Sequence, residues 1–383
     1  MANRWVALAI VFVTRTSMGF QFQAVASVAP LIIGDLGLSY AQLGTLVGIY
    51  MLPGAFFALP GGFIGQRFGE RRVVVAGLAL MVAGGVLTAS AGSFAGAAIG
   101  RIVSGIGAVF MNILLTRLIS DWFAGKELTT ALGVMLTSWP VGLGLATAML
   151  GGLAAGSGWR WPITMTAIGA AVGLLLMLLA FREAPRPAGM PAARPRFVSL
   201  DGRDLRLSIS AGFAWGCFNA SLVAIIVFAP GLLIARGIPL GDAGSIVSLA
   251  IWLTIVSIPL GGLLGERISH NVLIVVGSLV AATITFLIPV ISPAILAFCL
   301  VGFAIGPPPG PLMALLPRAL PPERLTTAFA VFYTLFYAMM ALTQPAAGFV
   351  RDRFGDPSAP IVFAAIVMAS TVIGLAIFRR LER

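Results

Sequence analysis

The stretch Gly61-Gly62-Phe63-Ile64-Gly65-Gln66-Arg67 recurs 200 residues later as Gly261-Gly262-Leu263-Leu264-Gly265-Glu266-Arg267. With a slightly shorter offset of 197 residues, Leu128-Thr129-Thr130-Ala131 matches Leu325-Thr326-Thr327-Ala328. The match therefore extends well beyond a single motif. It predicts that the chain consists of two homologous halves.

The composition of the chain excludes an ordinary soluble protein. Of its 383 residues, 59% are hydrophobic and only 10% are charged, and the mean hydropathy is +1.03. Twelve apolar runs are each long enough to cross a membrane as a helix, namely 5–31, 41–64, 73–92, 95–119, 130–155, 161–181, 208–234, 243–264, 272–290, 294–316, 327–350 and 358–378. The first run is too long for a cleavable secretory signal. We therefore expect an all-α integral membrane protein with twelve transmembrane helices.

The basic residues concentrate on one side of the predicted membrane. The formal net charge is +11, which in a soluble protein would indicate a nucleic-acid partner. Here 18 of the 24 basic residues lie at the termini or in loops on the same side as the termini. The positive-inside rule therefore predicts cytoplasmic N- and C-termini in a plasma membrane, the inner membrane of a bacterium. We expect no nucleic-acid partner.

A segment rich in proline and arginine separates the two halves. It begins at Arg182 and reaches Arg196. Proline cannot continue a helix, so we expect a cytoplasmic linker whose arginines lie near anionic lipid headgroups. The predicted organisation is an N-terminal six-helix bundle over 1–181, a linker over 182–206 and a C-terminal six-helix bundle over 207–383. We expect the protein to be a monomer.

Two motifs carry a resemblance to a known family. The stretch from Gly62 to Arg72 is similar to the loop signature Gly-x-x-x-Asp-Arg-x-Gly-Arg-Arg, although Gln66 replaces the aspartate and Glu70 an arginine. In the fourth run, Arg101-Ile-Val-Ser-Gly-Ile-Gly-Ala is similar to Arg-x-x-x-Gly-x-Gly-Ala. Both signatures belong to the major facilitator superfamily, which the chain resembles over essentially its whole length.

The resemblance implies two six-helix bundles around a central cavity and secondary transport by alternating access. Arg67 and Arg71 of the loop motif, and Arg267 of its weaker second copy, would contact helix ends and carboxylates and so latch one conformational state. The resemblance ties Arg101 to coupling. An anchor for a polar network between helices is an equally good interpretation of that residue.

Prolines mark two expected hinges. In the fifth run, Thr137-Ser138-Trp139-Pro140 is followed by two nearby glycines. In the tenth run, Pro307, Pro308 and Pro309 lie between Gly306 and Gly310. Proline frees backbone groups and bends a spanning helix where its neighbours can satisfy those groups. We therefore expect the fifth span to bend and the tenth to be kinked or locally unwound.

Arg15 lies near the middle of the first apolar run. At about 1.5 Å of rise per residue it lies about 15 Å into a hydrocarbon core about 30 Å thick. A lipid-facing guanidinium would be costly there, so the side chain should face protein or a water-filled cavity. Two roles are open, a substrate contact or a structural partner for carbonyls and hydroxyls of neighbouring spans. The sequence from Arg15 to Gln23, with Ser27-Val-Ala-Pro30, is weakly similar to the cyanate and nitroimidazole permease branch.

The predicted substrate site combines residues on the face of Arg15 with residues that the repeat places opposite it. The offset of 200 residues brings Arg15 onto Trp215. Single aromatic residues in spans more often pack than bind, and it is their convergence on four spans that favours a site. The predicted set is Arg15, Gly19, Phe22, Gln23, Ser138, Trp139, Trp215, Phe218, Asn219, Tyr333, Phe336 and Tyr337.

The placement of ionisable side chains favours an anionic substrate. All 13 carboxylates and the only histidine, His270, fall in loops or at the ends of runs. A cation would meet no counter-charge in mid-membrane, whereas an anion would meet Arg15. Arginine stays charged at ordinary pH, so no group there can take up a proton. Exchange, facilitated diffusion and symport with a proton carried on the substrate stay open.

We therefore predict a secondary transporter of a small organic or inorganic anion. Efflux of drugs or other hydrophobic compounds, and a non-transporting sensor of the same fold, are the alternatives. No nucleophile with a positioned base and no phosphate loop is present in the sequence, so we expect no enzyme activity. Cys217 and Cys299 lie in apolar runs as small hydrophobic residues, and we expect neither a metal nor another cofactor.

Overall fold

The computed structural model describes residues 3–57, 61–123, 127–184 and 198–383. These residues fold into α-helices, and no strand occurs among them. The helices are α1 Arg4–Ser27, α2 Ala29–Leu36, α3 Tyr40–Gly48, α4 Leu52–Phe57, α5 Gly61–Phe68, α6 Glu70–Ala89, α7 Phe94–Trp122, α8 Leu128–Ser157, α9 Arg160–Leu179, α10 Gly202–Ala235, α11 Leu240–Arg267, α12 His270–Leu287, α13 Ala294–Ala304, α14 Pro309–Met313, α15 Leu315–Ala319, α16 Pro322–Phe354 and α17 Ala359–Glu382. Twelve stretches of the described chain are long and apolar enough to cross a membrane, which confirms the predicted all-α architecture.

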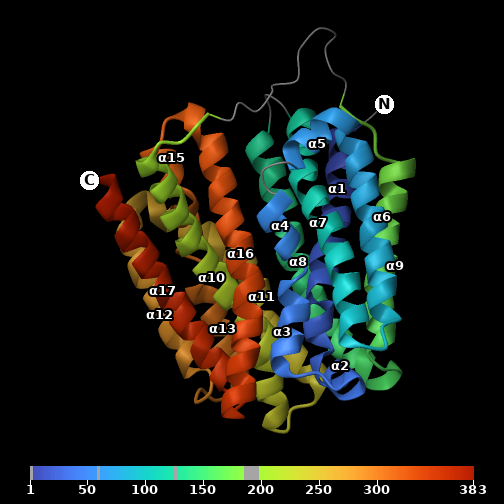
Figure 1. Cartoon of the computed structure of the whole chain (residues 1–383). Helices are drawn as coiled ribbons and strands as arrows, with labels where there is room; N and C mark the ends of the chain where they lie inside the picture. Colours follow the sequence, from blue (N-terminus) through green and yellow to red (C-terminus); the bar gives the residue numbers. More distant parts are fainter. Residues whose placement is uncertain (1–2, 58–60, 124–126, 185–197) are drawn as a thin grey trace.

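The helices form two bundles, α1 to α9 and α10 to α17 (Figure 1). Both termini lie at one end of the molecule, where the bundles diverge, and the bundles come together at the opposite end. The second bundle begins with α10 at Gly202, because the Asp201 side chain accepts the backbone N–H of Asp204 and caps the helix. Residues 202–206 are therefore helical, although the sequence placed them in the linker, and the linker residues 185–197 lie outside the described residues.

Three predicted spans are interrupted. The first apolar run, expected to reach Leu31, is divided because α1 ends at Ser27 and Pro30 lies in the first turn of α2. The second run is divided between α3, which ends at Gly48, and α4, which begins at Leu52, and residues 58–60 ahead of α5 lie outside the described residues. The tenth is divided between α13, which ends at Ala304, and α14, which begins at Pro309. The break expected at the three prolines of the tenth run is therefore present.

The two halves keep one ion-pair position and reverse its charges. Arg4 at the start of α1 pairs with Glu127 before α8 at 2.7 Å. Arg324 at the start of α16 pairs with Asp204 of α10 and, at 2.9 Å, with Asp201. Offsets of 200 and 197 residues, those of the sequence repeat, relate Arg4 to Asp204 and Glu127 to Arg324. The same helix ends are thus joined in both halves by opposite charge arrangements.

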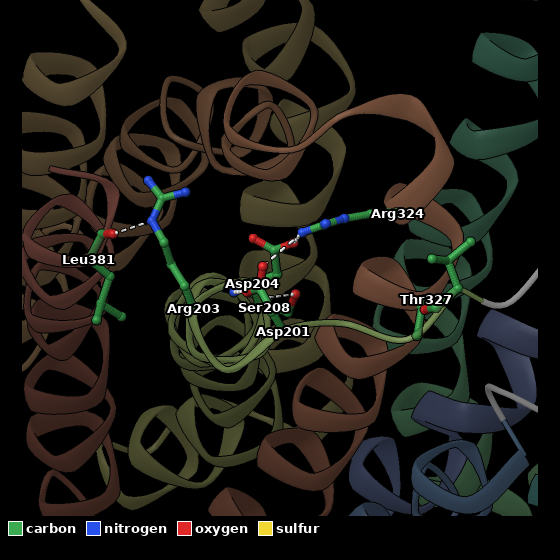
Figure 2. A network of polar contacts seen from close by, with 8 residues as sticks. Asp201, Arg203, Asp204, Ser208, Arg324, Thr327 and Leu381 are labelled. Atoms are coloured by element: carbon green, nitrogen blue, oxygen red, sulfur yellow. Dashed lines mark hydrogen bonds and ion pairs between the residues drawn. The ribbon is translucent and has the colours of Figure 1, made fainter.

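The pair in the second half belongs to a larger polar network (Figure 2). Asp204 is 3% exposed, and its backbone carbonyl accepts the Ser208 hydroxyl at 2.7 Å. Arg203 donates to the carbonyl of Leu381 at 3.0 Å, which ties α10 to the end of α17. The backbone N–H of Asp204 and the Arg324 guanidinium hold the pKa of Asp201 below its usual range.

We expect removal of Arg324 alone to cost more stability than removal of both charges of its pair. Arg324→Gln leaves the Asp204 side chain, which is only 4% exposed, without its counter-charge, and an unpaired buried carboxylate destabilises the fold. Asp204→Asn combined with Arg324→Gln removes the charge that needs a partner. Thermal unfolding in detergent should therefore show a lower Tm for the single variant than for the double variant.

The control for this comparison is Arg4→Gln in the more exposed pair of the first half. It should change the Tm little, because an ion pair in contact with water contributes little. A double variant that melts below Arg324→Gln would contradict the assignment of Asp204 as a buried charge that depends on Arg324.

Two seams hold the bundles together away from the termini, α3 against α16 and α8 against α11. A Cβ added to Gly348 of α16 would lie 2.0 Å from the carbonyl oxygen of Tyr40. A Cβ added to Gly244 of α11 would lie 2.2 Å from that of Thr147 in α8. These backbones approach so closely because glycine has no side chain.

Asp352 adds a charged clamp to the first seam. Its Oδ1 accepts the backbone N–H of Tyr40 at 2.9 Å and its Oδ2 that of Ala41 at 2.8 Å. A carboxylate there satisfies unpaired N–H groups of α3 and the positive end of its dipole. The sequence from Gly348 to Gly355 also has the spacing Gly-x-x-x-Asp-Arg-x-Gly. It contains both the aspartate and the arginine, whereas the loop described above has Gln66 in place of the aspartate. The motif with both charged residues thus lies at the end where the bundles come together, which we call the closed end.

We expect Asp352→Asn to loosen this clamp. The amide oxygen can keep one of the two accepted hydrogen bonds, but the amide nitrogen cannot accept the other and the charge facing the helix dipole is lost. The lost charge alone removes about 0.5 to 1 kcal/mol. Hydrogen exchange of the backbone amides at residues 40–44 should therefore accelerate at least about two- to fivefold, since each 1.4 kcal/mol is a factor of ten. Asp356→Asn is the matched control, because the Asp356 carboxylate accepts from Ser358 in its own loop. Equal exchange rates in the two variants would contradict a clamp at Asp352.

Candidate functional site

Arg15 is buried in α1 and bonded to two other helices. It is 8% exposed. Its Nε donates to Oδ1 of Asn112 in α7 at 2.9 Å. Its Nη1 lies within donor distance of three acceptors in α8, the carbonyls of Met135 at 3.1 Å and Leu136 at 3.2 Å and the Ser138 hydroxyl at 3.2 Å. The guanidinium therefore ties α1 to α7 and α8.

Pro140 explains why an acceptor is available in α8. Proline has no N–H, so the carbonyl of Leu136, four residues earlier, loses its helical donor. Nη1 of Arg15 supplies a donor to that carbonyl instead. The expected hinge at Pro140 is therefore bridged by the arginine. Structural bonds to carbonyls and a hydroxyl of neighbouring spans, one of the two roles left open by the sequence, are present.

These bonds leave part of the guanidinium unused. Among the described residues, no acceptor lies within hydrogen-bond distance of Nη2, and no carboxylate forms an ion pair with Arg15. Tyr333 and Tyr337 of α16, in the other half, lie within electrostatic range of the guanidinium. Tyr337 also lies beside Asn112. Arg15 thus brings a free donor and an uncompensated positive charge to the interface between the bundles.

Aromatic rings of the second half lie across this interface. The Trp215 ring of α10 lies 6.4 Å from Phe336 and 6.2 Å from Phe332, both in α16. Phe336 in turn lies 6.1 Å from Tyr333 and 5.0 Å from Tyr337. Phe332 and Tyr337 are buried, whereas the other three are half-buried. The predicted aromatic residues of α10 and α16 therefore do come together.

The first half contributes a smaller aromatic group. The buried Phe22 ring lies 5.4 Å from Trp139 of α8 and 5.7 Å from Tyr50, which follows α3. Gly19 packs against the backbone of α8, because a Cβ there would lie 2.7 Å from the carbonyl oxygen of Trp139. Its contact with a substrate stays a prediction.

Three further predicted residues make no hydrogen bond to Arg15 among the described residues. Gln23 is 1% exposed, and neither atom of its amide has a partner there. Asn219 donates to the Trp215 carbonyl of its own helix at 2.9 Å. Phe218 is buried in the core of the second half. Their contact with a substrate stays a prediction.

Arg101 uses all of its donor nitrogens within the first half. Nε donates to the carbonyl of Leu46 at 2.9 Å, Nη1 to that of Gln21 at 2.8 Å and Nη2 to that of Phe22 at 2.8 Å. The guanidinium also lies 4.3 Å from the centre of the Tyr50 ring. These bonds join α7 to α1 and α3, as the polar-anchor interpretation expects.

The other predicted gating residues lie near the end that carries the termini. Arg71 at the start of α6 donates to the carbonyls of Met177 at 3.1 Å and Leu178 at 2.9 Å, in the last turn of α9. Arg67 is exposed, and Arg267 is the last residue of α11. A latching role for these arginines stays a prediction.

Sequence reasoning missed Asn112, which holds the Nε of Arg15. A signal was present, because Asn112 is an amide in an apolar run and follows Arg101 by eleven residues, about three helical turns. The two polar residues of α7 therefore share one face. Their shared face does not reveal that Asn112 bonds to Arg15, whereas Arg101 bonds to the carbonyls of Gln21, Phe22 and Leu46.

The chain belongs to the Major Facilitator Superfamily, whose sequence model matches residues 11–342. It is 28% identical to inner membrane transport protein YajR of Escherichia coli over 54% of this chain and 45% of that protein. It is 25% identical to the probable sulfoacetate transporter SauU of Cupriavidus necator over 63% of this chain and 60% of that protein. The matches thus cover about half to three fifths of these curated relatives.

Solved structures show the same fold. The inward-open xylose transporter XylE from E. coli superposes with a TM-score of 0.79 at 13% identity, over 98% of this chain and 96% of that one. A bacterial homologue of the human lysosomal transporter Spinster, inward-facing and occupied, gives 0.76 at 19% identity, over 100% and 96%. These structures support the predicted fold, and the sequence model confirms the predicted superfamily. The cyanate and nitroimidazole permease branch stays a prediction.

We expect Arg15 and Pro140 to be coupled in stability. Arg15→Ala strips the Leu136 carbonyl of its donor, but in Pro140→Ala the new backbone N–H can bond that carbonyl. The Tm loss from Arg15→Ala should therefore be smaller in the Pro140→Ala background, with a coupling energy of about 1 kcal/mol. Thermal unfolding of the four proteins in detergent measures this cycle. The control is Pro259→Ala, at another proline inside a helix, whose effect on stability should be additive with that of Arg15→Ala. Additive effects of Pro140→Ala and Arg15→Ala would contradict the bridge between Arg15 and the Leu136 carbonyl.

Proposed function

We propose that the protein is a secondary transporter that carries a small organic or inorganic anion across the membrane by alternating access. The free Nη2 of Arg15 and its uncompensated charge at the interface of the bundles carry this proposal. An oxyanion that arrives there gains a charge-assisted hydrogen bond and neutralises the buried cation. Two relatives are named as transporters of anions, the probable sulfoacetate transporter and a hexuronate transporter of Bacillus subtilis. Their names support an anionic solute.

The proposal includes a membrane orientation and a state. The positive-inside rule puts the end with both termini in the cytoplasm of a bacterium, with the protein in the inner membrane. The bundles diverge toward that end, and the clamp at Asp352 joins them at the other. This arrangement corresponds to an inward-open transporter, the state in which XylE was solved. Transport then requires the clamp to break while the divergent ends close.

The proposed coupling follows from the ionisable groups. Arg15 keeps its charge, and the carboxylates lie in loops or at helix ends. Movement of the solute by exchange, by facilitated diffusion or with a proton on the solute itself fits this arrangement. The proposal includes neither enzyme activity nor a cofactor.

Efflux of hydrophobic compounds is the second candidate. The half-buried rings of Trp215, Tyr333 and Phe336 favour it. Two relatives also favour it by their names, the multidrug transporter mfsC of Aspergillus fumigatus and the quinolone resistance protein NorB of Staphylococcus aureus. A cationic drug would meet an uncompensated guanidinium with no carboxylate beside it. We therefore rank this candidate, and a non-transporting sensor, below anion transport.

We expect small carboxylates and inorganic oxyanions to raise the Tm of the purified protein, and hydrophobic cations to leave it unchanged. Arg15→Lys should weaken anion binding about tenfold, because one ammonium cannot reach Asn112, the α8 carbonyls and a ligand together. Arg160→Lys, in an exposed pair at the closed end, is the control and should bind as the unaltered protein does. Stabilisation by cations alone, or equal anion binding in both variants, would overturn the proposal.

A further inference from the structure

The anion site that we propose faces an aromatic wall. We define this wall as Trp215 of α10 with Tyr333 and Phe336 of α16. We infer that the wall binds an aromatic ring of the same solute whose carboxylate binds Arg15, so that the substrates are arylcarboxylates. The inference rests on the proposed function, because it assigns the remainder of the ligand that Arg15 holds.

The wall is continuous across two helices. Trp215 and Phe336 lie 6.4 Å apart with their ring planes tilted by 36°, and Phe336 and Tyr333 lie 6.1 Å apart nearly edge to face. Phe332 stacks on Trp215 with the ring centres 6.2 Å apart. Each ring is thus held by another ring, which gives a ligand a preformed surface at little cost in side-chain entropy.

Burial separates the wall from the aromatic core behind it. Phe332 and Phe218 are fully covered within the second bundle. The three wall residues are only half-buried, although they lie within the spans α10 and α16. Partly uncovered rings at the interface of two bundles are available to a flat apolar group. Offset or edge-to-face contact between rings adds about 0.5 to 1.5 kcal/mol beyond the area buried.

The wall approaches the guanidinium at Tyr333. Tyr333 belongs to the wall and is within electrostatic range of Arg15, as is its neighbour Tyr337. The offset of 200 residues also makes Trp215 the counterpart of Arg15, so the first half supplies a charge where the second supplies a ring. A ligand that uses both must carry its anionic group on the ring or within a short chain of it.

Trp215 also has an unused donor. Its Nε1 is buried and has no hydrogen-bond partner among the described residues. A buried donor left unpaired carries a desolvation cost, which an acceptor relieves. A carboxylate oxygen or a ring hydroxyl on the solute is such an acceptor, and an unsubstituted hydrocarbon is not.

The other ligand classes use only part of this arrangement. A small aliphatic or inorganic oxyanion binds Arg15 but leaves the rings uncovered. A hydrophobic cation covers the rings but is repelled by Arg15. An arylcarboxylate satisfies the charge and covers the wall, which is why we assign this class.

The experiment compares four probes by isothermal calorimetry on the purified full-length protein: benzoate, cyclohexanecarboxylate, acetate and benzyl alcohol. Cyclohexanecarboxylate matches benzoate in charge and approximate size but has no aromatic ring. We expect benzoate to bind about five- to tenfold more tightly than cyclohexanecarboxylate, the ratio that ring contacts provide, and to bind more tightly than benzyl alcohol. Nitrate and phosphate are included as inorganic anions.

Variants of the wall make the test specific. Trp215→Leu should weaken benzoate binding more than cyclohexanecarboxylate binding and so reduce the ratio toward one. Phe336→Leu, a second variant of the wall, should do the same and covers the case in which Trp215→Leu fails to fold. Phe303→Leu is the matched control, because the Phe303 ring is 52% exposed on α13 outside the wall, and its ratio should not change.

The outcomes separate this inference from the function on which it rests. Equal affinities for benzoate and cyclohexanecarboxylate, or acetate binding without benzoate binding, overturn the aromatic assignment and leave anion transport standing. Benzyl alcohol binding as tightly as benzoate overturns the assignment too, because the ring is then bound without its charge. If no carboxylate and no inorganic anion binds, the proposed function itself fails.

Discussion

A buried arginine that has no carboxylate partner among the described residues is the constraint on which the centre of this protein depends. Arg15 lies in a span, where an unpaired charge is expensive, and the fold meets this by surrounding it with neutral acceptors. One of these acceptors exists because Pro140 frees the carbonyl of Leu136. The hydrogen bond between Arg15 and Leu136 thus satisfies both the carbonyl freed by proline in one helix and the buried charge in another. Acceptor dipoles lower the cost of the cation without cancelling its charge, so the attraction for an anion persists.

Two buried arginines of the first half differ in what they leave unused. Arg101 directs each of its three nitrogens to a backbone carbonyl and lies on the Tyr50 ring, so all of its hydrogen bonds stay within the bundle. Arg15 commits Nε and Nη1 and leaves Nη2 without a partner among the described residues. The same residue type is therefore an anchor in one place and a candidate ligand-binding group in the other. The placement of the acceptors makes the difference, because three of the four around Arg15 lie at Nη1, whereas each nitrogen of Arg101 has one.

The repeat preserves geometry and lets chemistry diverge. Ion pairs join the same helix ends in both halves. The basic Arg4 corresponds to the acidic Asp204, and the acidic Glu127 corresponds to the basic Arg324. At the centre, Arg15 corresponds to Trp215, so the halves contribute unlike groups to one interface. A repeat constrains which helices pack and where their ends meet, because both halves bury similar surfaces. It does not constrain which side chain faces the shared interface, and selectivity can arise there.

The sequence alone determined the all-α class, the twelve spans and the two halves, because length, hydropathy and repetition are properties of the chain itself. It also singled out Arg15, since a charge in an apolar run is visible without coordinates, and it predicted the break at the three prolines of the tenth span. Only the tertiary structure decided that Nη2 is the nitrogen left free, that Gly19 packs on α8, and that Asp352 joins residues more than 300 positions apart. These depend on which helices approach each other and at what height. Hydrogen bonds and close contacts act over a few ångströms between residues distant in sequence, and no local pattern records them.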